Sequence, residues 1–294
     1  MGCPIGFYRA TETDDMLEAL QYDFMRNALL AGLLTSIACG IIGTLVVVNR
    51  LVFLSGGIAH AAYGGIGLAF FLGLPYTLGT LGFSLVAAMV MATVTLRIKH
   101  RSDTIIGVVW AVGMAVGVIL LDLTPGYNVD LMSYLFGSIL TVPTSDLWQM
   151  LAVSGVMAFM AGFFYNDFLA FSYDEEFARL RGVPVRLLHY VLLAMVALSV
   201  VMIIRVVGLI LLIALLTISP YIAERYSNSL RAMMILSTFL NALCTTAGLW
   251  LSYTFNLTSG ATIIMVGASF FFISFLAERL KPRRSPWISK PVED

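Results

Sequence analysis

The sequence predicts an all-α fold, a polytopic bundle of about eight or nine transmembrane helices. The chain of 294 residues is 60% hydrophobic and only 12% charged, whereas an ordinary soluble domain has about 25% charged residues. Apolar runs of about 20 residues, the length that crosses a bilayer as a helix, recur along the whole chain. Basic residues gather in alternate connections between these runs, as in membrane proteins with a defined orientation.

The apolar runs define the spans in chain order. The sixth and seventh are separated only by the stretch around Arg205 and Gly208, so eight spans is the alternative to nine. We expect an N-terminal segment over 1–23, one membrane domain over 24–280 and a cytoplasmic tail over 281–294. The predicted spans are 25–48, 52–73, 78–97, 104–121, 146–165, 187–204, 207–223, 230–252 and 260–279.

The basic connections predict the orientation, because Lys and Arg are enriched in cytoplasmic loops. With nine spans they all fall on one side, which places the C-terminus in the cytoplasm and the acidic N-terminus outside. The segment 122–145 then lies outside, where its mixed polarity predicts a short helix or re-entrant piece. The basic groups are Arg97, Lys99, His100 and Arg101; Arg179, Arg181 and Arg186; Arg225 and Arg231; and Arg279, Lys281, Arg283, Arg284 and Lys290.

Several function classes lack their signatures. The sequence has no GxxxxGK[ST], HExxH or GxSxG motif, which excludes a P-loop ATP site and these hydrolase types. A formal net charge of zero argues against a nucleic-acid partner. The spans hold almost no carboxylates, which weakens a proton-coupled antiporter. Cys3, Cys39 and Cys244 are expected to be isolated thiols, and His100 and His189 to be solvated residues of cytoplasmic loops.

The stretch FLSGGIAHAAYGGIG, residues 53–67, places glycines and a histidine inside a predicted span. On a helix, Gly57, Ala61 and Gly65 form a seam of small residues that permits close approach of another helix. We expect this seam also to permit the approach of a second copy across a two-fold axis. A neighbouring stripe of the same helix carries Gly56, His60, Tyr63, Gly64 and Gly67.

His60 is an ionisable residue in the middle of an apolar span. One interpretation is a packing histidine that donates a hydrogen bond to a carbonyl on a nearby helix. The other is a transition-metal ligand or proton carrier on a translocation path, and it is favoured because intramembrane ionisable groups usually face a cavity or a partner. One imidazole does not hold a metal alone, so a second copy is expected to contribute.

The connection 168–188 begins with acids and continues with basic residues, an order that suits the dipole of a short helix. Gly182 and Pro184 are expected to end that helix, with Phe177 and Leu180 on one side. Such a helix lies on lipid or docks a cytoplasmic partner, and docking is favoured because an anionic leaflet repels adjacent acids. Its charged residues are Asp174, Glu175, Glu176, Arg179 and Arg181.

Pro220 lies within the seventh predicted span. Proline removes a backbone hydrogen bond and kinks a helix, and Thr217 and Ser219 are expected to satisfy the freed backbone groups. A kink near the cytoplasmic exit makes Pro220 a candidate gate. The alternative, given equal weight, is that Pro220 is simply one of the prolines that transmembrane helices commonly tolerate.

Taken in order, these pieces resemble the membrane permease of ABC importers for zinc, manganese or iron. The resemblance runs from about residue 24 to residue 279. It is carried by FLSGGIAHAAYGGIGLAFFLG, SYLFGSILTV, YDEEFARLRGVP with VGLILLIALLTISPYIAERYS, and SGATIIMVGASFFF.

The resemblance implies a permease of the kind found in type II ABC importers, working as a two-fold homodimer in a prokaryotic plasma membrane. It implies two cytoplasmic ATP-binding subunits and an extracytoplasmic metal-binding protein as partners. ATP hydrolysis would then occur in a partner chain, so this chain would be a transport subunit and no enzyme. No permanently bound cofactor is implied, because Zn²⁺, Mn²⁺ or Fe²⁺ would be the cargo.

The resemblance also assigns roles to particular residues. In the family, an aspartate four residues before a histidine lines the metal path with it; here the histidine is His60 and the aspartate position is Gly56. Imidazoles without a carboxylate suit zinc better than manganese, and Cys39 or backbone carbonyls are candidates to complete the site. The helix Asp174–Gly182, within a coupling segment of about 172–184, matches the ATPase-contacting helix of the family.

Three alternatives remain at this point. A siderophore or cobalamin permease would need a wide path without a metal ligand. A stand-alone secondary transporter would need membrane acids or inverted repeats, and neither is evident in the sequence. A membrane enzyme that uses a metal on His60 would need more polar groups near that residue.

Overall fold

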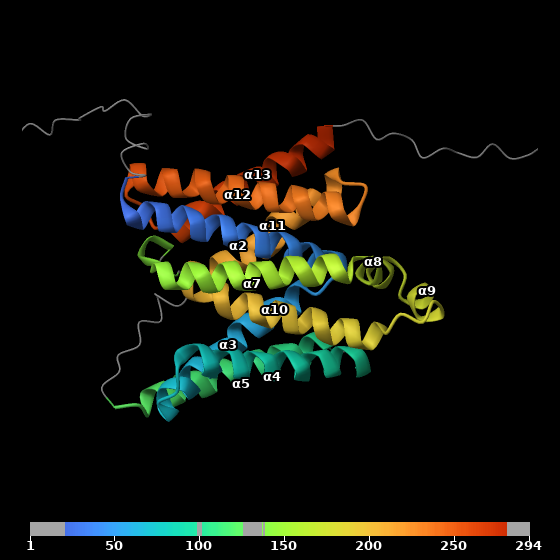
Figure 1. Cartoon of the computed structure of the whole chain (residues 1–294), viewed down its shortest axis with the longest axis horizontal. Helices are drawn as coiled ribbons and strands as arrows, with labels where there is room; N and C mark the ends of the chain where they lie inside the picture. The colour runs from blue at the N-terminus through green and yellow to red at the C-terminus, as the bar shows by residue number, and fades with distance from the viewer. Residues whose placement is uncertain (1–20, 99–101, 126–136, 138, 281–294) are drawn as a thin grey trace, which may run out of the picture.

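A computed structural model describes most of the chain and leaves out its two ends, 1–20 and 281–294 (Figure 1). The predictions made for those segments, for His100 and for most of 122–145 therefore lie outside the described residues. The structure describes residues 21–98, 102–125, 137 and 139–280.

The described residues form an all-helical bundle, which confirms the predicted fold class. Nine of these helices are long and apolar enough to cross a membrane, so nine spans rather than eight is correct for this part of the chain. The elements are α2 (Asp23–Val48), α3 (Val52–Leu72), α4 (Tyr76–Arg97), α5 (Ser102–Asp122), η1 (Ile139–Thr141), α7 (Thr144–Phe163), α8 (Tyr165–Tyr173), α9 (Glu175–Leu180), α10 (Val185–Val207), α11 (Leu209–Tyr226), α12 (Leu230–Phe255) and α13 (Ser259–Leu280).

A single residue, Gly208, separates the sixth span from the seventh. Its φ of 80° lies in a region that L side chains rarely adopt, so glycine breaks the helix there at low cost. Val207 and Leu209 on either side are buried. The short separation of these two spans had left eight or nine spans open in the sequence. In the structure it is a tight reversal of the chain between α10 and α11.

The spans form two groups with α10 between them (Figure 1). Helices α3, α4 and α5 pack mainly on one another, and α2 packs on α7, α11 and α12. Helix α10 contacts α3 and α4 on one side and α2 and α7 on the other. Any relative movement of the two groups must therefore involve the contacts of α10.

Helix α2 is the centre of the larger group. A Cβ atom at Gly40 would lie 2.7 Å from the backbone of Thr238 in α12, and one at Gly43 would lie 2.7 Å from the carbonyl oxygen of Leu216 in α11. Membrane helices pack through such small residues because burial of apolar surface adds little inside a bilayer. The glycines of α2 thus let three helices meet closely.

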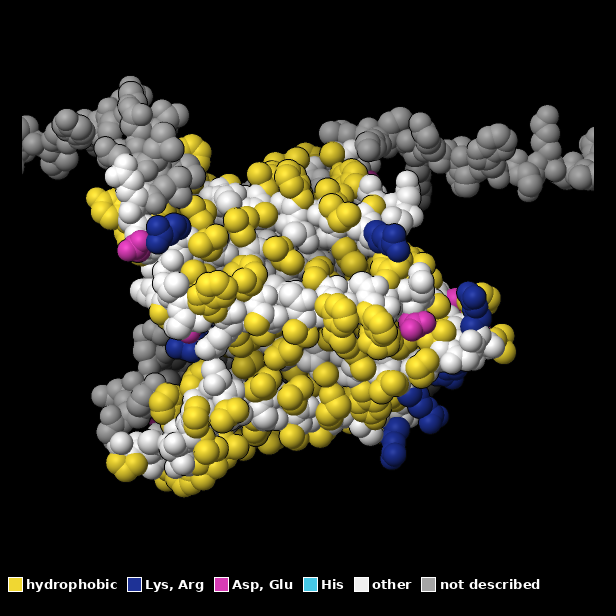
Figure 2. Space-filling model, in the orientation of Figure 1, with side chains coloured by type: hydrophobic (Ala, Val, Ile, Leu, Met, Phe, Trp, Pro, Cys, Tyr) yellow, Lys and Arg dark blue, Asp and Glu magenta, His cyan; other side chains and the backbone are white. Residues whose placement is uncertain are grey.

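The described arginines divide unequally between the two ends of the bundle. Arg26 and Arg205 lie at the end where α2 begins, and all the others lie at the end that carries α9. Figure 2 shows hydrophobic side chains over the middle of one face, with basic side chains confined to its ends. By the enrichment of basic residues in cytoplasmic loops, the α9 end is the cytoplasmic end.

Candidate functional site

The small-residue seam of α3 is a packing surface, as expected, but its partners are helices of the same chain. A Cβ atom at Gly57 would lie 2.7 Å from Ile106 of α5, and one at Gly65 would lie 2.7 Å from the Cα atom of Thr80 in α4. The Cα atom of Ala61 faces Gly113 of α5. The expectation that this seam permits the approach of a second copy is therefore wrong, because α4 and α5 already occupy it.

Three neighbours of His60 on α3 differ in the space around them. Gly64 lies against the Gly113 carbonyl, and Tyr63 is 1% exposed and packs against Gly117. Gly56 is different, because a Cβ atom there would meet only Ile213, at 3.9 Å. Tyr63 and Gly64 thus serve helix packing, whereas the Gly56 position has room for a side chain.

His60 lies in the middle of α3 with one face of its ring covered by Trp110 of α5. The two rings are stacked, with centroids 4.0 Å apart and planes inclined by 17°. Trp110 donates from Nε1 to the sulfur of Met114 at 3.2 Å, and Phe53 tilts against its ring. The imidazole is thus oriented by an aromatic group on a different helix.

The Nδ1 atom of His60 is buried and has no hydrogen-bond partner among the described residues. Leaving such an atom unsatisfied costs about 1–3 kcal/mol. The packing interpretation required a hydrogen bond to a nearby carbonyl, and no such bond forms at this nitrogen in the described structure. An imidazole nitrogen without a partner is chemically suited to accept a proton or to bind a metal ion.

Few metal donors surround this nitrogen. The described residues contain no group of three or more His, Cys, Asp or Glu side chains arranged to hold a metal ion. Cys39 and Cys244 are free and buried, on α2 and α12 respectively. A single copy of the described chain therefore offers no complete metal cage.

The acidic stretch of the cytoplasmic connection forms a short, well-capped helix, α9. The Asp174 carboxylate accepts a hydrogen bond from the Phe177 amide at 2.9 Å, which caps the start of the helix. At its end, Gly182 adopts a φ of 77° and its amide donates to the Arg179 carbonyl, while the Val183 amide reaches back to Ala178. This pair of bonds is the Schellman arrangement that terminates helices at a glycine.

Helix α9 presents most of its side chains away from the bundle. Ala178 is buried, whereas Phe177 is half exposed and Leu180 is 87% exposed. Glu176 is exposed, and Glu175 pairs with Arg179 one turn along. Figure 1 shows α9 at the tip of the cytoplasmic end, so the helix has a free apolar and charged surface.

His189 does not lie in a solvated loop, as the sequence had suggested. It lies near the start of α10 with 7% of its surface exposed, and its Nε2 atom is 2.9 Å from the hydroxyl of Thr95 in α4. The single hydrogen of the Thr95 hydroxyl can point to the carbonyl of Met91 or Ala92 or to Nε2 of His189. This hydrogen bond therefore forms with either neutral tautomer of His189, and it ties α10 to α4.

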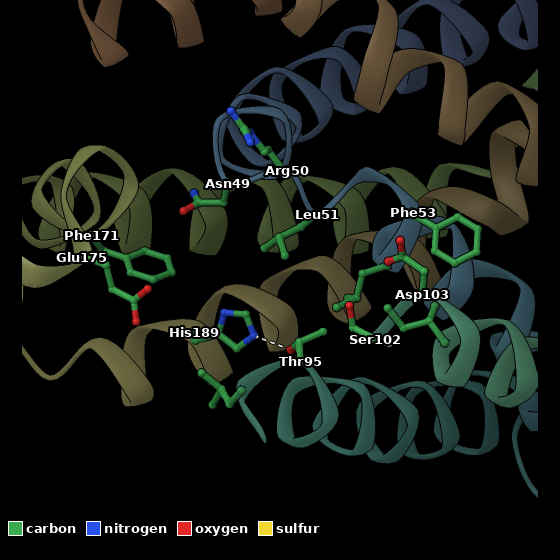
Figure 3. A pocket seen from close by; sticks show the side chains of 13 residues that line it. Asn49, Arg50, Leu51, Phe53, Thr95, Ser102, Asp103, Phe171, Glu175 and His189 are labelled. Atoms are coloured by element: carbon green, nitrogen blue, oxygen red, sulfur yellow. Dashed lines mark hydrogen bonds between the residues drawn. The ribbon is translucent and has the colours of Figure 1, made fainter. Parts of the chain in front are cut away.

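His189 also lines a cavity of about 290 Å³ at the cytoplasmic end (Figure 3). Glu175 of α9 and Phe171 of α8 lie on one side of the imidazole, and Thr95 lies on the other. Nearby, the Asn49 amide at the end of α2 donates to the Ser172 hydroxyl of α8 at 2.9 Å. Helix α8 is thus attached to the end of α2 by polar side chains.

Pro220 lies inside α11, as predicted, but the polar groups around it differ from those expected. Thr217 donates to the Ile213 carbonyl at 2.8 Å, whereas proline frees the carbonyl of Leu216. The side-chain amide of Asn241 in α12 donates to the carbonyl of Leu215 at 3.1 Å. Support for the backbone around the proline therefore comes from α12, and the role of Pro220 as a gate stays a prediction.

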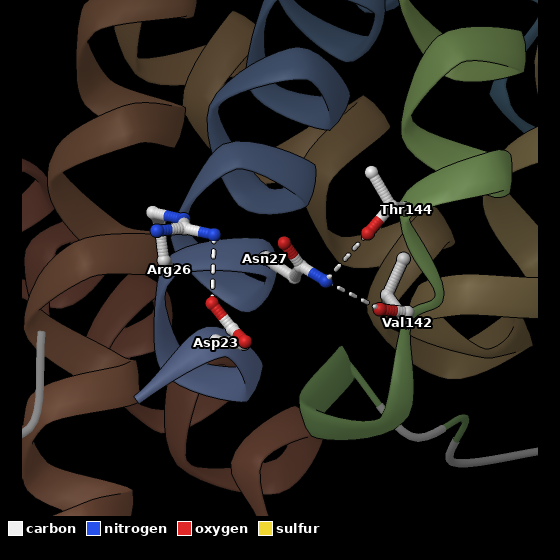
Figure 4. Close-up of polar contacts among 5 residues, drawn as sticks. All are labelled: Asp23, Arg26, Asn27, Val142 and Thr144. Atoms are coloured by element: carbon white, nitrogen blue, oxygen red, sulfur yellow. Dashed lines mark hydrogen bonds and ion pairs between the residues drawn. The ribbon is translucent and has the colours of Figure 1, made fainter. Parts of the chain in front are cut away.

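The opposite, outer end is held by a few polar contacts. Figure 4 shows the Asn27 side chain of α2 reaching the Val142 carbonyl, 3.2 Å away, in the segment before α7. Arg205 at the end of α10 pairs with the largely buried Asp146 of α7 at 3.4 Å and also covers the ring of Tyr76. Arg205 thus joins both groups of helices at this end.

Comparison with known proteins agrees with this architecture. The model of the ABC 3 transport family matches residues 21–278. The chain is 48% identical over 269 residues to the uncharacterized membrane protein slr2045 of Synechocystis sp., covering 92% of this chain and 96% of that protein. It is 32% identical over 274 residues to the manganese transport system membrane protein MntC of Listeria monocytogenes, covering 93% and 96% respectively.

A solved structure, PsaBC from Streptococcus pneumoniae in complex with Fab, is also similar. The TM-score is 0.81 at 32% identity, over 90% of this chain and 95% of that one. The chain belongs to the ABC 3 transport family. It is a multi-span membrane component of a metal transport system and not an enzyme, which confirms the resemblance seen in the sequence.

Proposed function

We propose that this chain is the permease subunit of an ATP-driven importer of a divalent transition metal, with zinc as the favoured ion. A separate cytoplasmic ATPase drives it, an extracytoplasmic binding protein delivers the metal, and two copies of the chain enclose the path. The observation that carries this proposal is the unpartnered Nδ1 atom of His60 in the middle of a membrane span, in a chain of this family.

His60 acts in this proposal as a transient ligand for the passing ion. An incomplete donor set suits a transport path, because the ion must also leave, whereas a closed tetrahedral site holds zinc firmly. Trp110 supports the role, since its stacking holds the imidazole in one orientation. The second copy supplies a second imidazole from a face other than the small-residue seam.

Zinc is favoured over manganese because of the donors near His60. Helix α3 carries no carboxylate, and glycine stands at Gly56, where the family has an acid. Manganese prefers oxygen ligands, and zinc binds imidazole readily. Relatives such as the Listeria protein are named for manganese transport, so manganese is the principal competitor.

Helix α9 serves as the coupling element in this proposal. Its exposed Phe177 and Leu180 would contact the ATPase, and its caps keep the six-residue helix formed. Motion of α9 would reach the spans through Ala178 against the bundle and, by way of α8, through the Asn49–Ser172 hydrogen bond. ATP binding would draw two such helices together and open the outer side, and hydrolysis would reset the path inward.

Uptake of labelled zinc and manganese into liposomes tests the proposal directly. The chain would be co-expressed with its ATPase and tested with its binding protein, as wild type and as Asp174→Ala and Asp174→Asn. Alanine removes the cap of α9 and is expected to reduce uptake, whereas asparagine caps equally well and is expected to preserve it. Equal uptake by the alanine variant and wild type would contradict the coupling role.

The same assay separates the alternatives. Uptake of a metal chelate but not of free ions would favour a siderophore or cobalamin permease. Uptake of free ions without the ATPase would favour a secondary transporter. Neither outcome is expected from the family assignment.

A further inference from the structure

An apolar groove runs along the outside of the bundle between α7 and α12. Both helices pack on α2 but make no comparable contact with each other, so α2 forms the floor of the groove. In Figure 1, α2 lies between α7 and α12 in the view. The groove has a volume of about 440 Å³, within the range of roughly 300–1,000 Å³ that is typical of ligand sites.

Small side chains on α7 hollow out one wall of this groove. Ala158, Ala161 and Gly162 line it there, and a Cβ atom at Gly162 would meet nothing within 4 Å. Met234 and Ile235 form part of the facing wall on α12. These two walls are therefore apolar, and one of them is built of small side chains, which matches an acyl chain better than a polar ligand.

The cytoplasmic end of the groove carries a cation, Arg231. Its guanidinium lies 4.3 Å from the centre of the Tyr165 ring, and both residues line the groove. No carboxylate of the described residues forms an ion pair with Arg231, whereas Arg225 near the end of the preceding span pairs with Glu278. Arg231 is thus available to an anion at the level where lipid headgroups lie.

We propose that this groove binds an anionic phospholipid of the cytoplasmic leaflet, with an acyl chain between α7 and α12 and the phosphate at Arg231. Basic pockets between transmembrane helices on the cytoplasmic side recognise acidic headgroups through this combination of charge and apolar surface. The site is separate from His60 and from α9. It lies between α7 and α12, which both pack on α2 and make no comparable contact with each other.

Native mass spectrometry of the full chain tests the proposal. The protein would be exchanged into nanodiscs of phosphatidylglycerol or phosphatidylcholine with identical acyl chains, and retained lipid would be counted after mild release. Wild type is expected to retain phosphatidylglycerol preferentially. Arg231→Gln is expected to lower that retention about fivefold, and Arg97→Gln, which removes a charge at the same end outside the groove, is expected to leave it unchanged.

A second pair of variants tests the apolar part. Gly162→Leu fills the groove and is expected to reduce retention of both lipids. Gly155→Leu is the matched control, because it also lies on α7 with open space around it but does not line the groove. Both additions meet open space, so both variants are expected to fold.

Two results would overturn the proposal. The first is equal retention of phosphatidylglycerol by wild type and Arg231→Gln. The second is loss of a dimer mass, rather than of lipid, in Gly162→Leu, since that would assign the groove to a second copy of the chain.

Discussion

His60 and His189 are both histidines within spanning helices, and their surroundings differ completely. Nε2 of His189 is hydrogen-bonded to the hydroxyl of Thr95 on a neighbouring helix. His60 has a buried Nδ1 atom without a partner and an indole stacked on its ring. The hydrogen-bonded His189 joins two helices, whereas the buried Nδ1 atom of His60 has no partner among the described residues and is suited to bind a proton or a metal ion.

The largest expected effect separates the two histidines in transport. His60→Ala is expected to reduce metal uptake by more than about tenfold, because even outer-shell changes cost metal sites about 10–100-fold in affinity. Uptake into liposomes, normalised to assembled complex, measures it. His189→Ala, assayed in parallel, is expected to transport metal near the wild-type rate. A larger loss of uptake in His189→Ala than in His60→Ala would contradict the different roles assigned to the two histidines.

The next effect concerns the choice of ion. Gly56→Asp places a carboxylate one helical turn before His60, where only Ile213 is near. It is expected to raise manganese uptake relative to zinc uptake by about tenfold, the order of effect that ligand-shell changes have on metal affinity. Competition between the two labelled ions gives the ratio. An unchanged ratio with His60 intact would show that the path does not pass this turn of α3.

A smaller effect is expected from the aromatic cover of His60. Aromatic stacking contributes about 0.5–1.5 kcal/mol beyond burial, so Trp110→Ala is expected to reduce uptake severalfold. Trp110→Phe keeps a ring over the imidazole and is expected to retain most activity. Similar losses in both variants would point to the Trp110–Met114 hydrogen bond instead of the stacking.

The last effect is expected on stability rather than on transport, at the other histidine. Thr95→Val removes the hydrogen-bond partner of His189 and is expected to lower the unfolding free energy by about 1–3 kcal/mol, since a buried polar nitrogen loses its partner. Thermal unfolding in detergent reports it. In a double-mutant cycle, the changes in unfolding free energy caused by His189→Ala and Thr95→Val are expected to be non-additive, because the two side chains are in contact. Additive changes would show that the hydrogen bond between them does not contribute to stability.

Much of the fold could be predicted from the sequence because span length and basic loops follow from the bilayer itself. The nine spans and the short capped helix at Glu175–Leu180 depend on local signals: apolar runs, an Asp cap and a Gly stop. Which helices pack against one another depends on tertiary packing, and no local sequence pattern predicts it. The small-residue seam at Gly57 correctly predicted a close helix contact. It did not predict that the contacting helices would be α4 and α5 of the same chain.

The candidate site was predicted only in part for the same reason. His60 was conspicuous as the one histidine of its span, but Trp110 lies 50 positions further along and meets it only in the fold. One signal was available: tryptophan favours membrane interfaces, so one near the middle of a span is unusual. His189 was misplaced because nearby charges suggested a loop, while burial depended on Thr95 across the helix interface.

The one-residue junction at Gly208 has a consequence for the biogenesis of the protein. With buried residues on both sides and the Gly137 backbone packed against it, the junction leaves no translocated loop between α10 and α11. The two helices are therefore expected to enter the bilayer together as a helical hairpin. An epitope tag inserted at this point should block insertion of both, although the position lies at the outer surface of the membrane.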